Sequence, residues 1–446
     1  MITNFPKIFS RKAISIYIAS LAVVSVVFMS HMMAPVFLML GVAWVVLFFG
    51  LSSRYSKKWE SIESRTFKIR IFVVALSLRV FWVLFSYIFF TLKTGLPFEF
   101  GSADALGYHD LAYWVSELDW KSAMNYFKRI GISDTGYPFY LTLLYRIFGP
   151  NILITRLIKC LLSSCMCLII YKFTRRNFGE SVGRLAAIFC CLMPNLILYC
   201  GLHLKETEML FLTFLALERI DNMIRGKKVN FWNVVIVGLL VISLFFFRTV
   251  LGSVVFFSMV TSLVFTNSAT TSRWNRVVLI SWALLAVAVF AGGSISKEIQ
   301  GYWRDRGSNQ AIKRSHQVKK GVAWAKYATG TVMAPMMFVM PLPTMVDVDG
   351  QYNQQLISGG NYVRNFLGIF VIITVFDAIF KRKNWRDFSL IGSYVVAYLA
   401  VICSSGFANS ERFLLPGLPA LLILAAYGVS IISGQNYKYV RMWYIC

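Results

Sequence analysis

The acidic side chains of this sequence are concentrated in one segment. The chain of 446 residues has only 20 Asp and Glu residues. Those between positions 98 and 140 are Glu99, Asp104, Asp110, Glu117, Asp119 and Asp134. A carboxylate beside a substrate can act as a general base, and Asp104 and Asp110 are the candidates for that role. Asp104 also stands at the start of an amphipathic pattern, where a carboxylate caps a helix well. The catalytic and the capping interpretation of Asp104 both stay open.

A second group of charged residues stands between two apolar runs, in the string Gly201-Leu-His-Leu-Lys205-Glu206. Charged groups beside the core of a bilayer are costly and are usually functional. Glu206 is therefore a third candidate catalytic carboxylate, and Lys205 is a candidate ligand for phosphate. The alternative is an ordinary interfacial turn in which Lys205 and Glu206 neutralise each other.

Further cations could hold a phosphate group through charge-assisted hydrogen bonds. Those at the ends of apolar runs are Arg248, Arg364 and Arg412. The segment 294–329 is also basic and contributes Arg304 and Arg306. It falls on the side of the membrane that is normally poor in Lys and Arg. Anionic headgroups of ordinary lipid, or the phosphate or pyrophosphate of a substrate lipid, would each explain this segment.

The cysteine and histidine spacings indicate no metal site. The chain has eight cysteines, and all except Cys446 lie in or beside apolar runs, without a CxxC pair. Such cysteines behave as small buried apolar residues. The sequence thus predicts no disulfide framework and no metal ligands.

The composition is that of a membrane protein. Hydrophobic residues make up 57% of the chain and charged residues 15%, and the mean hydropathy is +0.63. These values exclude a soluble globular enzyme, a disordered chain and a disulfide-rich secreted domain. The net charge is +25, but the basic residues lie in short clusters between apolar runs, as in cytoplasmic loops. Membrane lipid, and no nucleic acid, is the expected partner.

The apolar runs predict an all-α polytopic membrane protein with about twelve transmembrane helices, because a span needs ~20 apolar residues and must satisfy its own backbone. The predicted spans are Ile14–Met33, Ala34–Ser53, Ile71–Leu92, Asn151–Tyr171, Leu185–His203, Glu206–Ile220, Phe231–Phe247, Thr249–Thr266, Val277–Gly293, Asn361–Phe380, Phe388–Ser404 and Phe413–Ser433. The first is interpreted as a retained span and not as a signal peptide. We expect two parts, residues 1–70 with two spans and a basic loop, and a catalytic membrane domain over residues 71–446.

The basic clusters predict the orientation. They occupy residues 54–70, 172–176, 225–228, 273–276 and 381–386. With twelve spans these clusters share one side with both termini, and the positive-inside rule makes that side the cytoplasm. The loops 93–150 and 294–360 are then external, with an amphipathic helix from Asp104 onward lying on the membrane surface. The apolar, proline-containing piece 331–345 is predicted to be re-entrant or interfacial.

Several short motifs, in a fixed order, resemble a known superfamily. They are Ala103-Asp104-Ala105, Tyr108-His109, Gly136-Tyr137-Pro138, Met193-Pro194-Asn195, Lys205-Glu206 and Arg412-Phe-Leu-Leu-Pro416. Together they resemble the polyprenyl-phosphate-dependent glycosyltransferases of the GT-C superfamily, which include protein mannosyltransferase-like and aminoarabinose transferase-like enzymes. The resemblance extends from Phe98 to Tyr427.

The resemblance implies a GT-C-like fold and a catalytic Asp104 in the first large external loop. It also implies that Tyr108, His109 and Tyr137 contact the acceptor or the sugar. The chain departs from the family in lacking an acidic pair at Asp104 and in having two additional N-terminal spans. The subfamily and any divalent metal therefore stay open, and no other cofactor is implied. The implied location is the bacterial cytoplasmic (inner) membrane, with the active site on the external face.

Three functions are compatible with these residues. The first is the transfer of a sugar from a polyprenyl (pyro)phosphate donor to an external acceptor, with inversion and with Asp104 as base. The second is a repeat-unit polymerase of O-antigen, capsule or exopolysaccharide, which would use undecaprenyl-pyrophosphate glycans. The third is a lipid or glycan transporter or flippase. Transporters often have internal repeats and interrupted helices near the midplane, and the sequence shows neither, so transport is disfavoured.

Overall fold

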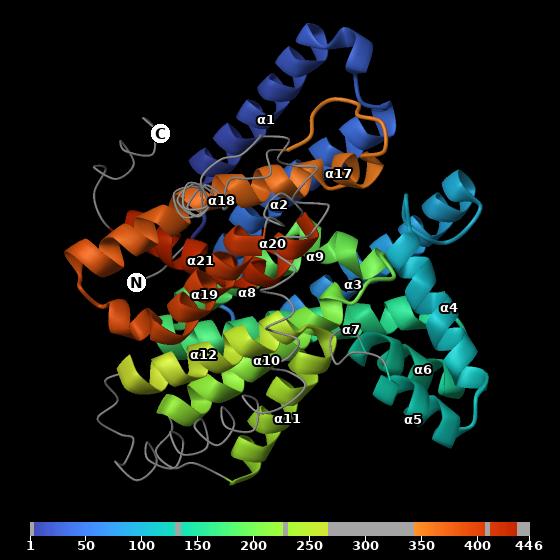
Figure 1. Ribbon diagram of the computed structural model, residues 1–446. Coiled ribbons are helices and arrows are strands. Elements are labelled where there is room, and N and C mark those ends of the chain that lie inside the picture. The colour runs from blue at the N-terminus through green and yellow to red at the C-terminus, as the bar shows by residue number, and fades with distance from the viewer. Residues whose placement is uncertain (1–3, 130–134, 226–230, 266–342, 406–410, 435–446) are drawn as a thin grey trace, which may run out of the picture.

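The chain folds into a bundle of helices, seen in the computed structural model of Figure 1. The structure describes residues 4–129, 135–225, 231–265, 343–405 and 411–434. These residues form helices joined by turns, with no strand among them. The predicted all-α, multi-pass membrane fold is confirmed.

Seven helical segments in the described part of the chain are long and apolar enough to cross a membrane. Four of them are single helices, α1 (Lys7–Val27), α2 (Pro35–Lys58), α3 (Ser64–Thr94) and α7 (Ile152–Phe178). The fifth, Ser358–Lys381, begins with α18 (Ser358–Phe376), and the sixth, Trp385–Ile402, contains most of α19 (Ser389–Ser405). The seventh, Glu411–Ile432, contains α20 (Glu411–Leu414) and most of α21 (Leu418–Gly434). An eighth is a bent pair, α8 (Glu180–Leu192) and α9 (Pro194–Leu198).

Three further helices occupy predicted spans. They are α10 (Glu206–Arg225), α11 (Phe231–Phe247) and α12 (Thr249–Phe265). The last two have 17 residues each, at the short end of the range for a span. All predicted spans except Val277–Gly293 therefore coincide with helices, and that one lies outside the described residues. The same holds for residues 331–342 of the predicted re-entrant piece.

The predicted span Leu185–His203 is formed by a broken helix, with a bend of 52° between Leu192 and Pro194. Pro194 has no N–H and cannot bond to the carbonyl group of Cys190 one turn earlier. Arg79 of α3 supplies the missing donors, with hydrogen bonds of 3.2 Å to the carbonyl oxygens of Cys190 and Cys191. Arg79 is fully buried. A charged side chain is thus placed inside the bundle to satisfy the backbone of a broken helix.

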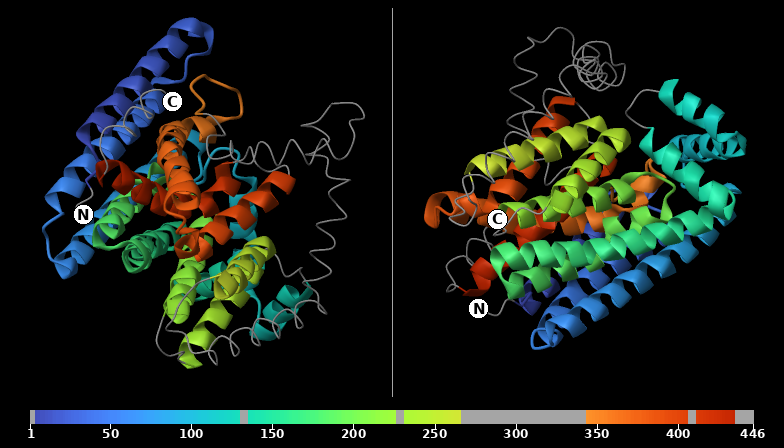
Figure 2. Two further views of the ribbon diagram at one scale, coloured as in Figure 1. Left: turned by 90° about the vertical axis from the view of Figure 1, so that its left-hand side faces the viewer. Right: turned by 90° about the horizontal axis from the view of Figure 1, so that it is seen from below.

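The two N-terminal helices share the core of the other helices. α2 packs on α8 and α18, and α1 packs on α2. The ring of Phe5 lies 5.5 Å from that of Phe189 and 6.2 Å from that of Phe370. Helix α3 continues without interruption across the predicted boundary at residue 70 and lies beside α7, as Figure 2 shows.

The helix ends gather at two ends of the bundle. The end that holds the start of α3 also holds the turn between α7 and α8, because Arg184 donates to the carbonyl oxygens of Trp59 and Glu60 at 2.6 and 3.0 Å. At the opposite end, on the right in Figure 1, lie α4 (Ala103–Glu117), α5 (Trp120–Arg129) and α6 (Gly136–Phe148). The described basic clusters and the acidic segment thus lie at opposite ends, as predicted. That the acidic end is the external one stays a prediction.

Helix α4 forms at the predicted place, but much of its apolar face is covered by protein. Leu111 and Val115 pack against Phe127 of α5 and Phe139 of α6. Leu111 and Val115 are therefore covered by protein, and the position of α4 on the membrane surface stays a prediction. The apolar spacing of α4 correctly predicted that one face of the helix is buried. The same spacing is expected whether that face packs on other helices or rests on lipid.

Candidate active site

Asp104 lies in the first turn of α4 and makes no cap. The N-cap position is Ser102, without a side-chain cap hydrogen bond. The carboxylate of Asp104 instead bonds to Nη1 of Arg412, and its side chain is 61% exposed. The capping interpretation is therefore wrong. The position still places a negative charge near the positive end of the helix dipole.

Arg412 joins two carboxylates from distant helices. Its Nη1 donates to Oδ2 of Asp104, and its Nε donates to Oε1 of Glu206 at the start of α10. The Glu206 side chain is fully buried, whereas that of Arg412 is 20% exposed. Glu206 thus holds Arg412 on its buried side, and the exposed parts of Arg412 and Asp104 face solvent.

A second cation approaches the same buried carboxylate. Nη2 of Arg248 lies 3.7 Å from Oε1 of Glu206, and its guanidinium group lies 4.7 Å from the centroid of the Phe413 ring. Nη1 of Arg248 and Oε2 of Glu206 are buried without a hydrogen-bond partner in the described part of the chain. A buried unsatisfied donor costs ~1–3 kcal/mol. An anionic ligand that reached Arg248 would relieve this cost.

Lys205 belongs to the same group of cations. Its Nζ lies 5.9 Å from the centroid of the Tyr108 ring. Burial, reinforced by the positive charge of Arg248, lowers the pKa of Lys205 to about 7. Lys205 is 2% exposed and Glu206 is 0% exposed, whereas an interfacial turn would keep both charges in water. The interpretation as an ordinary interfacial turn is therefore wrong.

A lysine of α7 bonds to the turn that carries Lys205. Nζ of Lys159 donates to the carbonyl oxygens of Leu202 and Leu204, and it lies 3.7 Å from Oε2 of Glu208. Lys159 is fully buried. Lys159 was not among the predicted site residues, although a charged residue inside a predicted span is a signal of function or of structural need.

The three residues assigned to the acceptor or sugar lie together beside this group. The rings of Tyr108 and Tyr137 meet edge to face at 5.1 Å. Nδ1 of His109 lies 2.7 Å from the hydroxyl of Tyr145, which lies 3.3 Å from Nε2 of His203. Tyr137 is fully buried and stands behind Tyr108, which is half-buried. Burial lowers the pKa of His109, which favours the neutral imidazole.

The other predicted site residues stand apart. Asp110 is exposed and makes no hydrogen bond or ion pair with any described residue. Arg364 bonds to Glu411 at 2.7 Å, one residue before Arg412. Arg304 and Arg306 lie outside the described residues. Within the described ranges, no group of three His, Cys, Asp or Glu side chains could hold a metal ion.

Residues 135–302 match a known family. The family is described as dolichyl-phosphate-mannose-protein mannosyltransferase. In the described part of the chain the match covers α6 to α12, and so includes Lys205, Glu206 and Arg248. It supports the resemblance to the GT-C superfamily and indicates a membrane glycosyltransferase. No curated protein matches the chain.

Proposed function

We propose that this chain transfers a sugar from a polyprenyl phosphate or pyrophosphate donor to an acceptor on the external face of a bacterial cytoplasmic membrane. The observation that carries the proposal is the meeting of an exposed carboxylate, Asp104, with three cations at one end of the bundle. These cations are Lys205, Arg248 and Arg412. A base beside a group of cations is what a reaction needs when it removes a proton and releases a phosphate.

In the proposed reaction the acceptor hydroxyl attacks the anomeric carbon while Asp104 takes its proton. The bond between that carbon and the phosphate oxygen breaks, and the lipid phosphate leaves with the bonding electrons. A single displacement inverts the anomeric centre. The cations balance the charge that develops on the phosphate, because they are fixed before the reaction begins.

Arg412 has two roles in this scheme. In the structure it holds Asp104, and it is also a cation near the solvent-exposed side of the site. A donor phosphate would compete with Asp104 for Arg412, so donor binding would release Asp104 to act as base. Glu206 would keep Arg412 in place throughout, as a positioning residue.

The test is sugar transfer by Asp104→Asn, with Asp110→Asn as the matched control on the same helix. Membranes that contain each variant are incubated with a panel of radiolabelled undecaprenyl-phosphate sugars, and release of undecaprenyl phosphate is measured. We expect a fall of about 10²-fold or more for Asp104→Asn, because the amide cannot accept the proton. Asp110→Asn should retain most of the activity. Full activity of Asp104→Asn would show that the base is misassigned.

A further inference from the structure

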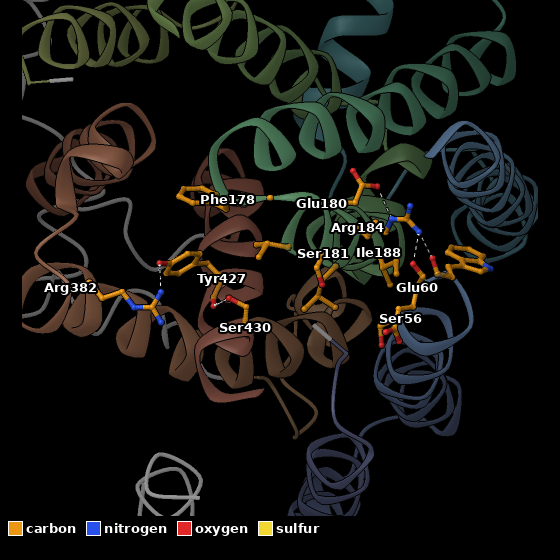
Figure 3. Close-up of a pocket in the computed structure, with 14 residues that line it drawn as sticks. Ser56, Glu60, Phe178, Glu180, Ser181, Arg184, Ile188, Arg382, Tyr427 and Ser430 are labelled. Atoms are coloured by element: carbon orange, nitrogen blue, oxygen red, sulfur yellow. Dashed lines mark hydrogen bonds and ion pairs between the residues drawn. The ribbon is translucent and has the colours of Figure 1, made fainter. Parts of the chain in front are cut away.

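A cavity of about 490 Å³ lies at the end of the bundle opposite Asp104. It is enclosed by the end of α2, the start of α8, the end of α21 and the turn that follows α18 (Figure 3). Helix α3 has 31 residues and spans roughly 45 Å at ~1.5 Å per residue, so it separates this cavity from the candidate active site. The volume is that of a site for a small molecule or a headgroup.

One wall of the cavity carries a cation. Arg382, Tyr427 and Ser430 lie together on this wall in Figure 3. Nη1 of Arg382 lies 3.4 Å from the hydroxyl of Tyr427. Its Nε lies 2.9 Å from Oδ2 of Asp377 in an ion pair, and the Arg382 side chain is 42% exposed. The guanidinium group is thus held by Asp377 at Nε, with Nη1 beside the hydroxyl of Tyr427.

The opposite wall carries a carboxylate. Glu60 lies there beside Arg184 (Figure 3). Arg184 is paired with Glu180, whose carboxylate lies 2.8 Å from its Nε and 2.9 Å from Nε of Arg175. Glu60 accepts a hydrogen bond of 2.7 Å from the neutral side chain of Asn4 and forms no ion pair with any described residue. This wall therefore holds a carboxylate that no described cation pairs with.

We infer that this cavity binds the headgroup of a phospholipid that carries both a phosphate and a primary amine. The phosphate would lie at Arg382 and Tyr427, and the ammonium group at Glu60. A purely anionic headgroup would meet the charge of Glu60, and a purely cationic ligand would meet that of Arg382. Each contact is a charge-assisted hydrogen bond.

The surroundings of the cavity agree with a lipid. It lies at the end of the bundle where the described basic clusters gather, and pockets between helices at this level of a membrane bind lipid headgroups. Its lining also includes the apolar side chains of Trp59, Phe178, Leu185 and Ile188. Such side chains suit the glycerol and the first methylene groups of a lipid. The inference goes beyond the proposed transfer, because it concerns a different site.

The experiment measures the melting temperature of the delipidated full chain in detergent, during titration with short-chain phosphatidylethanolamine, phosphatidylcholine or phosphatidylglycerol. Saturable stabilisation by phosphatidylethanolamine, at lower concentration than by the other two lipids, is expected. The quaternary amine of phosphatidylcholine cannot donate to Glu60, and phosphatidylglycerol has no amine. Equal stabilisation by all three lipids would overturn the inference, as would equal stabilisation by water-soluble phosphoethanolamine.

Two pairs of variants locate the site. Arg382→Gln and Glu60→Gln should each raise the half-saturating phosphatidylethanolamine concentration about 10- to 100-fold, as expected for the loss of one charge-assisted bond. The controls are Lys383→Gln and Glu63→Gln, which remove the same charges beside the cavity without lining it. Unchanged titrations for both test variants would overturn the inference. If Arg382→Gln fails to fold, the inference is tested by Glu60→Gln and by retention of phosphatidylethanolamine on the wild-type chain in native mass spectrometry.

Discussion

The two ends of the bundle use charge in opposite ways. Around Asp104, the charges come from helices far apart in the sequence and surround a carboxylate that is fully buried. At the basic end, many pairs are local, such as Glu180 with Arg184 and Asp221 with Arg225, each four residues apart. Local pairs on a helix contribute little and cost little. A buried, incompletely satisfied group of charges is costly, and its presence indicates a function.

Buried polar atoms without a hydrogen-bond partner occur at both ends of the described bundle. At the Asp104 end, Arg248 and Glu206 each keep a buried polar atom without a partner among the described residues. At the basic end, Glu180 is bonded by Arg175, Arg184 and Tyr171. Asp377 and Arg219 at the basic end also keep buried polar atoms without a hydrogen-bond partner among the described residues, so such atoms alone do not mark a ligand site.

The largest effect on stability should come from Glu206→Ala, compared with Glu180→Ala at the other end. The first leaves two cations beside an empty buried position, which costs ~3–5 kcal/mol of unfolding free energy. The second removes a half-exposed carboxylate and should cost less than ~1 kcal/mol. Denaturant unfolding of both purified variants measures the difference. Equal losses would remove the contrast between the two ends.

A loss of similar size is expected for Arg79→Leu, which tests the support of the broken helix. The carbonyl groups of Cys190 and Cys191 would each lose a donor, at ~1–3 kcal/mol per buried acceptor. Thermal unfolding of the purified chain checks this. Arg175→Leu, which removes a half-exposed arginine at the basic end, is the control and should change the melting temperature little. An unchanged melting temperature for Arg79→Leu would contradict the role assigned to Arg79.

Arg412→Ala should weaken binding of undecaprenyl phosphate by about 10- to 100-fold, because one charge-assisted contact is worth ~1.5–3 kcal/mol. Isothermal titration with undecaprenyl phosphate in detergent measures the affinity. Arg386→Ala, at the basic end, should bind as the wild type does. If Arg412→Ala binds undecaprenyl phosphate with normal affinity, Arg412 does not bind the phosphate and only positions Asp104.

The smallest expected effect is a pH dependence of that affinity. The pKa of Lys205 is lowered to about 7, so its charged form is lost as the pH rises through 7. Phosphate binds the charged form, and affinity should therefore fall roughly fivefold between pH 7 and pH 8. Lys205→Arg stays charged over this range and should abolish the fall. A wild-type affinity that does not change with pH would exclude Lys205 from the phosphate site.

Much of the site could be predicted from the sequence, for one physical reason. A charge near the bilayer core is costly wherever the helices lie, so Glu206, Arg248 and Arg412 stand out from the apolar runs beside them. Asp104 stands out because it lies in the acidic segment 98–140. The structure brings these four into one connected group. Arg364 also lies beside an apolar run and was predicted to be in the site, but it bonds to Glu411 and is not part of the connected group.

The sequence by itself determined the helices, because in lipid an apolar run must satisfy its backbone within the segment. Only the tertiary structure decided which helices lie side by side. It showed that Arg79 donates to the backbone at the end of α8, and that Lys159 donates to the backbone of the turn before α10. It also showed that Val115 of α4 packs against residues of α5 and α6. The spacing of apolar residues reports which face of a helix is buried, but not against what. Contacts between residues as distant as Asp104 and Arg412 depend on the packing of the whole bundle.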